Sequence, residues 1–206
     1  MNNPAARNKG NITIEDLTFL GEGLNNEPLS LEEAKSRSDW PKWKQAMYEE
    51  IKQLHNLRTY TITKLPEDRK AIACKWVYRL KKDSEGNIVH YKACRVAKGF
   101  SQILGIDFDK TFAPVMRLDT LQLLLALSVS LNLKIYVVDV IGAYLNAHLK
   151  ETIYMKQIPD YENGTNDVLQ LLRTLYGLKQ SGRAWNEKLN VAFLKLGYTQ
   201  LISDQY

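Results

Sequence analysis

The stretch L-K-I-Y-V-V-D-V-I-G-A-Y-L, residues 133–145, decides how the rest of the chain is interpreted. Its apolar part, Ile135 to Val138, is rich in β-branched residues and predicts a short, buried central strand. Asp139 follows directly, and an ionised carboxylate in an apolar run is costly unless a cation or hydrogen-bond donors meet it. From these residues alone two interpretations are open: Asp139 caps the next turn, or it binds a metal ion.

The residues after Asp139 favour the metal-binding interpretation. Gly142 and Ala143 leave the backbone N–H groups open, and an aromatic side chain, Tyr144, stands five residues after the aspartate. A metal-held phosphate chain needs bare N–H groups beside the metal ligand and a flat wall beyond them. We therefore take Asp139 as the candidate catalytic and metal-binding residue, and Gly142, Ala143 and Tyr144 as candidates for nucleotide binding.

Residues 139–157, D-V-I-G-A-Y-L-N-A-H-L-K-E-T-I-Y-M-K-Q, resemble the first catalytic segment of copia-type retrotransposon reverse transcriptases, which usually reads D-V-x-x-A-F-L-x-G-x-L-x-E-x-I-Y-M-x-Q-P. Two further motifs match in the expected order. Residues 106–115, I-D-F-D-K-T-F-A-P-V, are similar to the family's G-x-D-Y-x-x-T-F-A-P-V loop, and residues 175–185 match L-Y-G-L-K-Q-x-x-R-x-W. The resemblance runs from about Asn56 to the end of the chain.

This resemblance implies an α+β fold of the right-hand polymerase type, with a fingers hairpin from about Ala71 to Val96 and a partial palm carrying Asp139. Strands separated by helices, without regular βα alternation, favour the same class over a doubly wound parallel sheet. In the family, two Mg²⁺ ions activate the primer end and stabilise the departing pyrophosphate, and the partners are an RNA or DNA template–primer and a dNTP.

The further carboxylates of the family come from a Y-V-D-D hairpin, and no such run occurs in these 206 residues. We therefore expect the chain to be truncated before that hairpin and the thumb, and to lack the C-terminal half of the polymerase. With Asp139 as its one catalytic carboxylate, it should hold Mg²⁺ weakly and be inactive alone.

The resemblance also assigns roles in the nucleotide site. Lys81 stands where these polymerases carry a lysine that contacts the triphosphate, and Gln180 matches the glutamine beside the nucleotide sugar and template base. Tyr144 matches the aromatic that excludes a 2′-hydroxyl, with core packing as the alternative. The chain departs from the family where Y-K-A-R-L-V-A-K-G-F reads Y-K-A-C-R-V-A-K-G-F, with Cys94 at the arginine position. A one-residue shift along a strand turns Arg95 to the opposite face, so Arg95 is not expected to replace that arginine.

The predicted hairpin carries many cations among its aromatic residues. Residues 71–81 and 88–96 alternate as strands do, and S-E-G-N at 84–87 supplies turn residues. From the residues alone, a solvated charged face and a phosphate-binding face are about equally supported. With the resemblance, we take the following as nucleic-acid-binding candidates: Lys75, Arg79, Lys92, Arg95 and Lys98.

The remaining patterns predict the framework. The run S-L-E-E at 30–33 reads as a capping box that opens a short helix, and D-W-P at 39–41 opens a second helix with an apolar stripe. Asp107 and Asp109 are close enough to suggest paired carboxylates, although loop capping is the preferred interpretation. Further strands are predicted at 59–65, 153–157 and 168–175, an apolar helix backing the palm sheet at about 119–132, and a last helix from about 183 to Gly197.

Composition excludes several other classes of protein. The 206 residues are 45% hydrophobic and 25% charged, with a net charge of +5, which is ordinary for a globular protein and compatible with nucleic acid. Two cysteines without a C-x-x-C pair argue against a zinc site or a disulfide scaffold and fit a reducing compartment. No apolar run reaches the ~20 residues that span a bilayer, and the start lacks a signal peptide. We therefore expect no membrane partner and a cytoplasmic location, in virus-like particles as in the family, or a nuclear one.

The expected organisation is a polar flexible tail at 1–27, leader helices at 28–57 and an incomplete reverse transcriptase domain at 58–206. Two functions remain open. The chain is either a fragment of a retrotransposon RNA-directed DNA polymerase, or a non-catalytic nucleic-acid-binding module derived from a retroelement. A reading frame that continues into a Y-V-D-D run favours the first, and a stop with retained binding favours the second.

Overall fold

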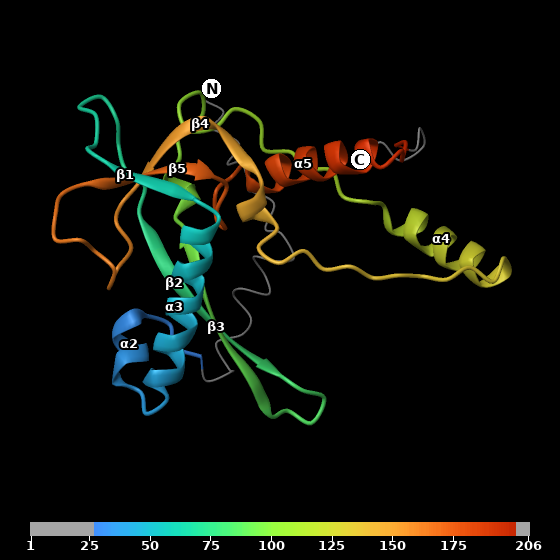
Figure 1. Ribbon diagram of the computed structural model, residues 1–206, viewed down its shortest axis with the longest axis horizontal. Helices are drawn as coiled ribbons and strands as arrows, with labels where there is room; N and C mark the ends of the chain where they lie inside the picture. The colour runs from blue at the N-terminus through green and yellow to red at the C-terminus, as the bar shows by residue number, and fades with distance from the viewer. Residues whose placement is uncertain (1–26, 201–206) are drawn as a thin grey trace, which may run out of the picture.

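Figure 1 shows the computed structural model of the chain, which describes residues 27–200. The tail predicted at 1–27 therefore lies outside the described residues except for its last position. The fold is mixed α and β, and both of its sheets are antiparallel, as the α+β prediction requires. The elements are α2 (Leu31–Ser36), α3 (Trp40–Asn56), β1 (Tyr60–Thr63), β2 (Cys74–Lys82), β3 (Ile88–Ala97), α4 (Leu118–Ser130), β4 (His148–Met155), β5 (Val168–Arg173) and α5 (Ser181–Lys195), with short 3₁₀ turns at Gly99–Ser101 and Tyr144–Asn146.

The first two helices begin where the sequence predicts. The Ser30 hydroxyl accepts the Glu33 backbone N–H at 3.1 Å and so caps α2. Helix α3 has a proline in its first turn, where the missing N–H costs nothing. Its apolar stripe faces inward, and the buried residues of α3 are Trp43, Ala46, Met47, Glu50, Ile51 and Leu54.

Strands β2 and β3 form an antiparallel hairpin with two unlike faces. Trp76 lies opposite Arg95 and Tyr78 opposite Ala93, so these four share one face, which packs against α3. The Trp43 ring lies 5.2 Å from the Tyr78 ring, edge to face. The other face carries most of the cations, because the alternation of a strand sends neighbouring side chains to opposite sides.

The second sheet has the order β1-β5-β4. Ile72 and Met155 form an isolated bridge that joins the start of the hairpin to the edge of this sheet. Buried residues of α3, the hairpin and the three-stranded sheet belong to one hydrophobic cluster, so these elements share a core. At its far end the hairpin meets Gly177, whose φ of +88° and close approach to the Ala97 carbonyl oxygen both require glycine.

The central prediction of a buried strand at Ile135–Val138 is wrong for this structure. Residues 133–140 are extended but form no strand, and Val137 is 94% exposed. Helix α4 buries none of its residues, begins at Leu118 without a side-chain cap, and does not back the sheet. Figure 1 shows α4 apart from both sheets, at the end of two long connections. We call residues 117–141 the α4 arm.

The reason for this error is physical. An apolar sequence predicts that a segment needs cover, but the cover must come from another surface, and none of the described residues supplies one for the α4 arm. A strand likewise needs a hydrogen-bonded neighbour, and the described sheets leave residues 133–140 unpaired. Within residues 27–200, no helix combines the length and the apolar character needed to cross a membrane.

Candidate functional site

A cavity of about 430 Å³ lies between α3, the β2–β3 hairpin and the turn after Asp139, and we call it the hairpin cavity. Three residues predicted from the sequence, Lys81, Asp139 and Gly142, line it together. They come from segments almost 60 residues apart, so the fold brings the candidate catalytic carboxylate and the candidate triphosphate lysine to one space. Ala143 adjoins this group in sequence without lining the cavity.

The turn after Asp139 is held against α3. Gly142 has a φ of +60°, and a Cβ built on it would overlap the side-chain amide of Gln53. A larger residue at 142 would therefore be strained in its backbone and would displace Gln53. The glycine was identified from the sequence, but for a different reason, its open backbone N–H.

The side chains that α3 contributes were missed by the sequence interpretation. Glu49, Glu50 and Gln53 line the hairpin cavity, whereas α3 was expected only to pack on the core. One signal was available: Glu50 stands three residues after Met47 and four before Leu54, inside the apolar stripe of an amphipathic helix. A carboxylate in that stripe requires a hydrogen-bond donor, and Glu50 has one in β3.

Tyr144 contacts the hairpin cavity indirectly. Its ring lies 4.9 Å from the ring of Tyr176, which lines the cavity, and its carbonyl oxygen accepts the Thr174 hydroxyl. Burial raises the pKa of Tyr176 to about 12, and the nearby Cys94, Tyr144, Glu50 and Asp139 add to the shift. In this arrangement Tyr144 therefore packs against a wall of the cavity.

Cys94 and Arg95 point in opposite directions, as predicted from the one-residue shift. Cys94 lines the hairpin cavity, and burial, followed by the charge of Glu50, raises the pKa of its thiol to about 11. At neutral pH the residue is an uncharged thiol and brings no positive charge to the cavity. Arg95 lies on the α3 face of the hairpin, opposite Trp76.

The assignment of Arg95 to nucleic-acid binding does not fit this structure. Its side chain is 0% exposed and lies over the Trp76 ring at 5.3 Å, so it cannot reach a phosphate. None of its guanidinium nitrogens has a hydrogen-bond partner among the described residues. Burial lowers the pKa of Arg95 to about 9, against the opposing charges of Glu50, Glu162 and Tyr60. Sequence reasoning placed its face correctly but not its burial.

The other candidate cations remain on or near the surface of the hairpin. Lys75, Arg79, Lys81 and Lys92 share the face opposite α3, because Arg79 pairs with Lys92 in the ladder and the others lie two or four residues away. Arg79 also forms an ion pair with Glu27 at 3.1 Å. Lys98 follows β3 and is half-buried.

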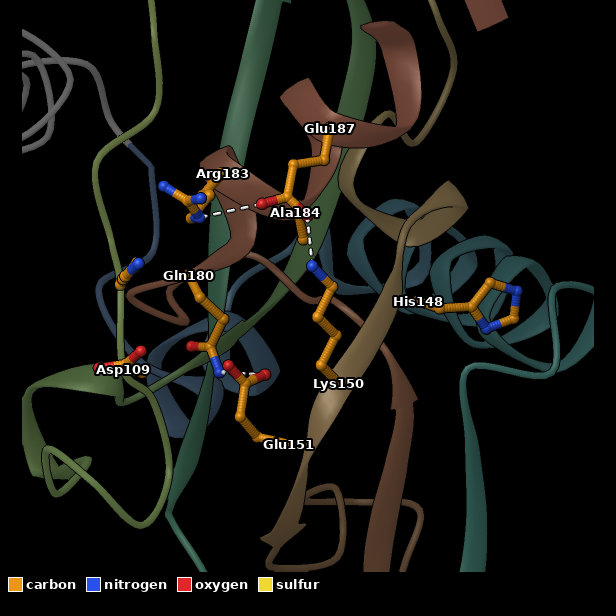
Figure 2. A pocket seen from close by; sticks show the side chains of 9 residues that line it. Asp109, His148, Lys150, Glu151, Gln180, Arg183, Ala184 and Glu187 are labelled. Atoms are coloured by element: carbon orange, nitrogen blue, oxygen red, sulfur yellow. Dashed lines mark hydrogen bonds and ion pairs between the residues drawn. The ribbon is translucent and has the colours of Figure 1, made fainter. Parts of the chain in front are cut away.

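Gln180 lies in a second cavity, of about 240 Å³, between β4, α5 and the loop at 109–110 (Figure 2). It is 3% exposed, and its amide donates to the Asp107 carbonyl oxygen at 2.8 Å and to Glu151 at 3.3 Å. Glu187 pairs with Lys150 at 2.6 Å and with Arg183 at 3.0 Å. Three carboxylates and three cations line this cavity, so their charges balance. The predicted nucleotide-binding residues are therefore divided between two cavities.

The capping interpretation of Asp107 is confirmed. Its carboxylate accepts the Ile103 backbone N–H at 2.9 Å and lies 3.4 Å from Arg69. Both cysteines are free thiols.

The described residues do not fit a pair of magnesium ions. Asp139 is exposed, and no group of three or more His, Cys, Asp or Glu side chains in residues 27–200 could hold a metal ion. Each Mg²⁺ needs near-octahedral oxygen coordination, for which one carboxylate is too few.

Comparison with known proteins agrees with the resemblance seen in the motifs. The reverse transcriptase (RNA-dependent DNA polymerase) family matches residues 57–205. The Retrovirus-related Pol polyprotein from transposon TNT 1-94 of Nicotiana tabacum is 38% identical over 182 residues, which cover 87% of this chain and 14% of that protein. The corresponding polyprotein from transposon RE2 of Arabidopsis thaliana is 33% identical over 183 residues, covering 87% and 12%.

A shorter relative also matches. An uncharacterized mitochondrial protein of Arabidopsis thaliana is 40% identical over 85 residues, which cover 41% of this chain and 50% of that protein. No solved structure matches the chain. The chain thus spans only a small part of the polyproteins that it resembles, yet the family covers most of it. By its motifs, their order and these matches, the chain belongs to the reverse transcriptase (RNA-dependent DNA polymerase) family.

Proposed function

We propose that this chain is the first part of the RNA-directed DNA polymerase of a copia-type retrotransposon. The intact enzyme would perform Mg²⁺-dependent nucleotidyl transfer with dNTPs on an RNA or DNA template. The observation that carries the proposal is the meeting of Lys81 and Asp139 at the hairpin cavity, within a family match over residues 57–205. A cation and a carboxylate across one space suit a nucleotide whose phosphates meet the lysine.

In this proposal the β2–β3 hairpin corresponds to the fingers, and the β1-β5-β4 sheet to part of the palm. The hairpin projects from the shared core and presents its cations on the face away from α3, as a surface that grips a phosphate backbone would. The turn at 139–142 would then lie below the hairpin, with the nucleotide between them. Arg95 is left out of the binding set because it is buried.

These residues alone are proposed to bind nucleic acid without extending a primer. One exposed carboxylate cannot hold two magnesium ions, and without them most of the charge stabilisation at the reacting phosphate is lost. Binding depends on other residues, the cations of the hairpin, and can persist without the chemistry. Each phosphate contact releases counterions, so affinity should fall steeply as salt rises.

The test combines binding and chemistry on the purified chain. A fluorescent RNA–DNA template–primer is titrated at several salt concentrations, and primer extension is assayed with Mg²⁺ and dNTPs. The expected result is salt-dependent binding without extension. Lys81→Glu with Lys92→Glu should flatten the salt dependence by about 0.9 per lost phosphate contact. The matched control is Lys195→Glu, an exposed charge at the end of α5.

Each outcome decides a separate part of the proposal. Templated extension by the purified chain would contradict the incomplete catalytic site. Binding that ignores salt, or that weakens equally with the α5 control, would contradict the hairpin as the binding surface. Restored extension after addition of a segment carrying a Y-V-D-D hairpin would favour the polymerase over a purely binding module.

A further inference from the structure

The outer edge of β3 is paired without a neighbouring strand. Ala97 donates its backbone N–H to the carbonyl oxygen of Tyr176 at 2.8 Å. Two residues earlier, the Arg95 N–H donates to the Glu50 carboxylate at 2.9 Å. These two N–H groups point away from β2, where an added strand would otherwise be expected. A side chain of α3 thus satisfies a position that a strand would fill in a wider sheet.

We propose that Glu50 is a positioning residue of the hairpin cavity, and that it sets the place of β3 by accepting the Arg95 backbone N–H. The residue belongs to α3, at Trp40–Asn56, which precedes the family match at residues 57–205. It is 9% exposed, so its bond to β3 is shielded from water. Hydrogen bonds to ionised acceptors are shorter and stronger than neutral ones, which makes this contact a firm anchor.

The same helix reaches both sides of the cavity. Glu50 holds β3 on one side, and Gln53, less than one turn later, lies against Gly142 in the turn after Asp139. Helix α3 is therefore the shared support between the strand that carries Lys92 and Cys94 and the turn that carries Asp139. A shift of β3 relative to α3 would change the spacing across the cavity without altering any residue that faces the nucleotide.

This inference deepens the proposed function, because it matters for binding only if the hairpin cavity takes a nucleotide. Its first consequence can be measured without any ligand. The Arg95 amide should exchange slowly with deuterium in the native chain and should lose protection when the acceptor is removed. Glu50→Met keeps the size of the side chain but cannot accept the bond. Glu50→Gln retains an acceptor oxygen and removes the charge.

The experiment is amide hydrogen exchange on the full chain, read at Arg95 and at core amides of β5. Glu50→Met should speed exchange at Arg95 by about tenfold or more, since bonds to charged acceptors are worth at least that factor. Glu50→Gln should restore exchange to near the wild-type rate. The control is Glu49→Gln, which lines the same cavity but bonds to Gln45 rather than to β3.

Template–primer binding by the same variants separates this inference from the proposed function. If Arg95 exchange responds as expected but no variant or wild-type chain binds template–primer, Glu50 positions β3 and the proposed function fails. Unchanged Arg95 exchange in Glu50→Met, with β5 amides also unchanged, would overturn the inference. Should Glu50→Met unfold and expose the β5 amides, Glu50→Gln decides: faster exchange at Arg95 alone would overturn the charge-independent positioning role.

Discussion

Helices α3 and α4 are both rich in apolar residues, but the structure treats them in opposite ways. Helix α3 has 17 residues, buries six of them, and joins the core shared by the hairpin and the three-stranded sheet. Helix α4 has 13 residues and buries none. The difference follows from patterning: α3 has one apolar stripe and one polar face, whereas α4 is apolar nearly all round.

A one-sided helix indicates which surface it packs on, because its polar face must stay in water. A helix that is apolar all round indicates only that it needs cover on several sides, and the described residues give it none. The α4 arm therefore identifies a large surface without naming what lies against it. The predictions below compare the packed region with the arm, beginning with the largest expected effect.

Removing the central aromatic of α3 should have the largest effect on stability. Trp43 is 0% exposed, and its ring contacts Tyr78 and Tyr91 edge to face. Trp43→Ala should lower the free energy of unfolding by about 3–5 kcal/mol, measured by urea denaturation. The matched change in the α4 arm, Leu125→Ala, should stay within about 0.5 kcal/mol, because this leucine is 45% exposed. Equal losses at both sites would show that the arm is packed in solution.

Two glycines with nearly the same backbone conformation give the next comparison. Gly177 has φ +88° and Gly197 has φ +87°, but only at Gly177 would a Cβ meet other atoms, the Ala97 carbonyl oxygen and a Val96 methyl. Alanine at either position should cost about 1–2 kcal/mol for the positive φ. Gly177→Ala should lose about 1–3 kcal/mol more, because the turn and β3 must separate. Similar losses in urea denaturation of both variants would contradict this close packing.

The sequence predicted local structure better than long-range cover. The capping box at Ser30, the stripe of α3 and both hairpin strands follow from local pattern and turn chemistry, and they appear in the structure close to the expected bounds. The strand at Ile135–Val138 depends on a neighbour far away in the chain or outside it, which no local pattern can supply. Its failure is therefore one of partner and not of composition.

The candidate site divides in the same way. Motif spacing identified Lys81, Asp139 and Gly142, and the fold brings them to one cavity. Glu50 and Gln53 were missed because a helix with a clear apolar stripe is normally assigned to packing. The opposite orientation of Cys94 and Arg95 follows from strand alternation alone. That Arg95 ends in a dry core depends on what covers that face, which only the structure shows.

One residue on the packed side should destabilise the protein. Arg95 is fully buried, and its guanidinium has no hydrogen-bond partner among residues 27–200. Arg95→Leu should therefore raise the free energy of unfolding by about 1–3 kcal/mol, since an unsatisfied buried charge is replaced by an apolar side chain. The control is His90→Leu, on the exposed face of the same strand, which should stay within about 0.5 kcal/mol. A loss of stability in Arg95→Leu would show that this arginine has a partner in solution.

The smallest effect concerns the pH dependence of stability and again separates α3 from the arm. Burial raises the pKa of Glu50, and the Arg95 backbone N–H and the charges of Lys92 and Arg95 only partly oppose the shift. Cys94 and Tyr176 are the other titratable groups that face it across the cavity. Because the pKa of Glu50 is higher in the folded state, its protonated form stabilises the protein. That contribution is fully present below the unfolded pKa and is lost as pH rises through the folded one.

Glu50→Gln removes this titration while keeping the acceptor for Arg95. The variant and the wild type should therefore have similar stability at low pH, and the variant should become the more stable as pH rises toward neutrality. Urea denaturation at a series of pH values measures the difference. The matched change in the arm, Asp119→Asn, should give a curve parallel to wild type, because this side chain is 67% exposed and stays in water on unfolding. A wild-type chain that gained stability relative to Glu50→Gln as pH rose would mean that the carboxylate is held by a cation in solution, and that charge pairing, rather than a single backbone bond, joins α3 to the hairpin.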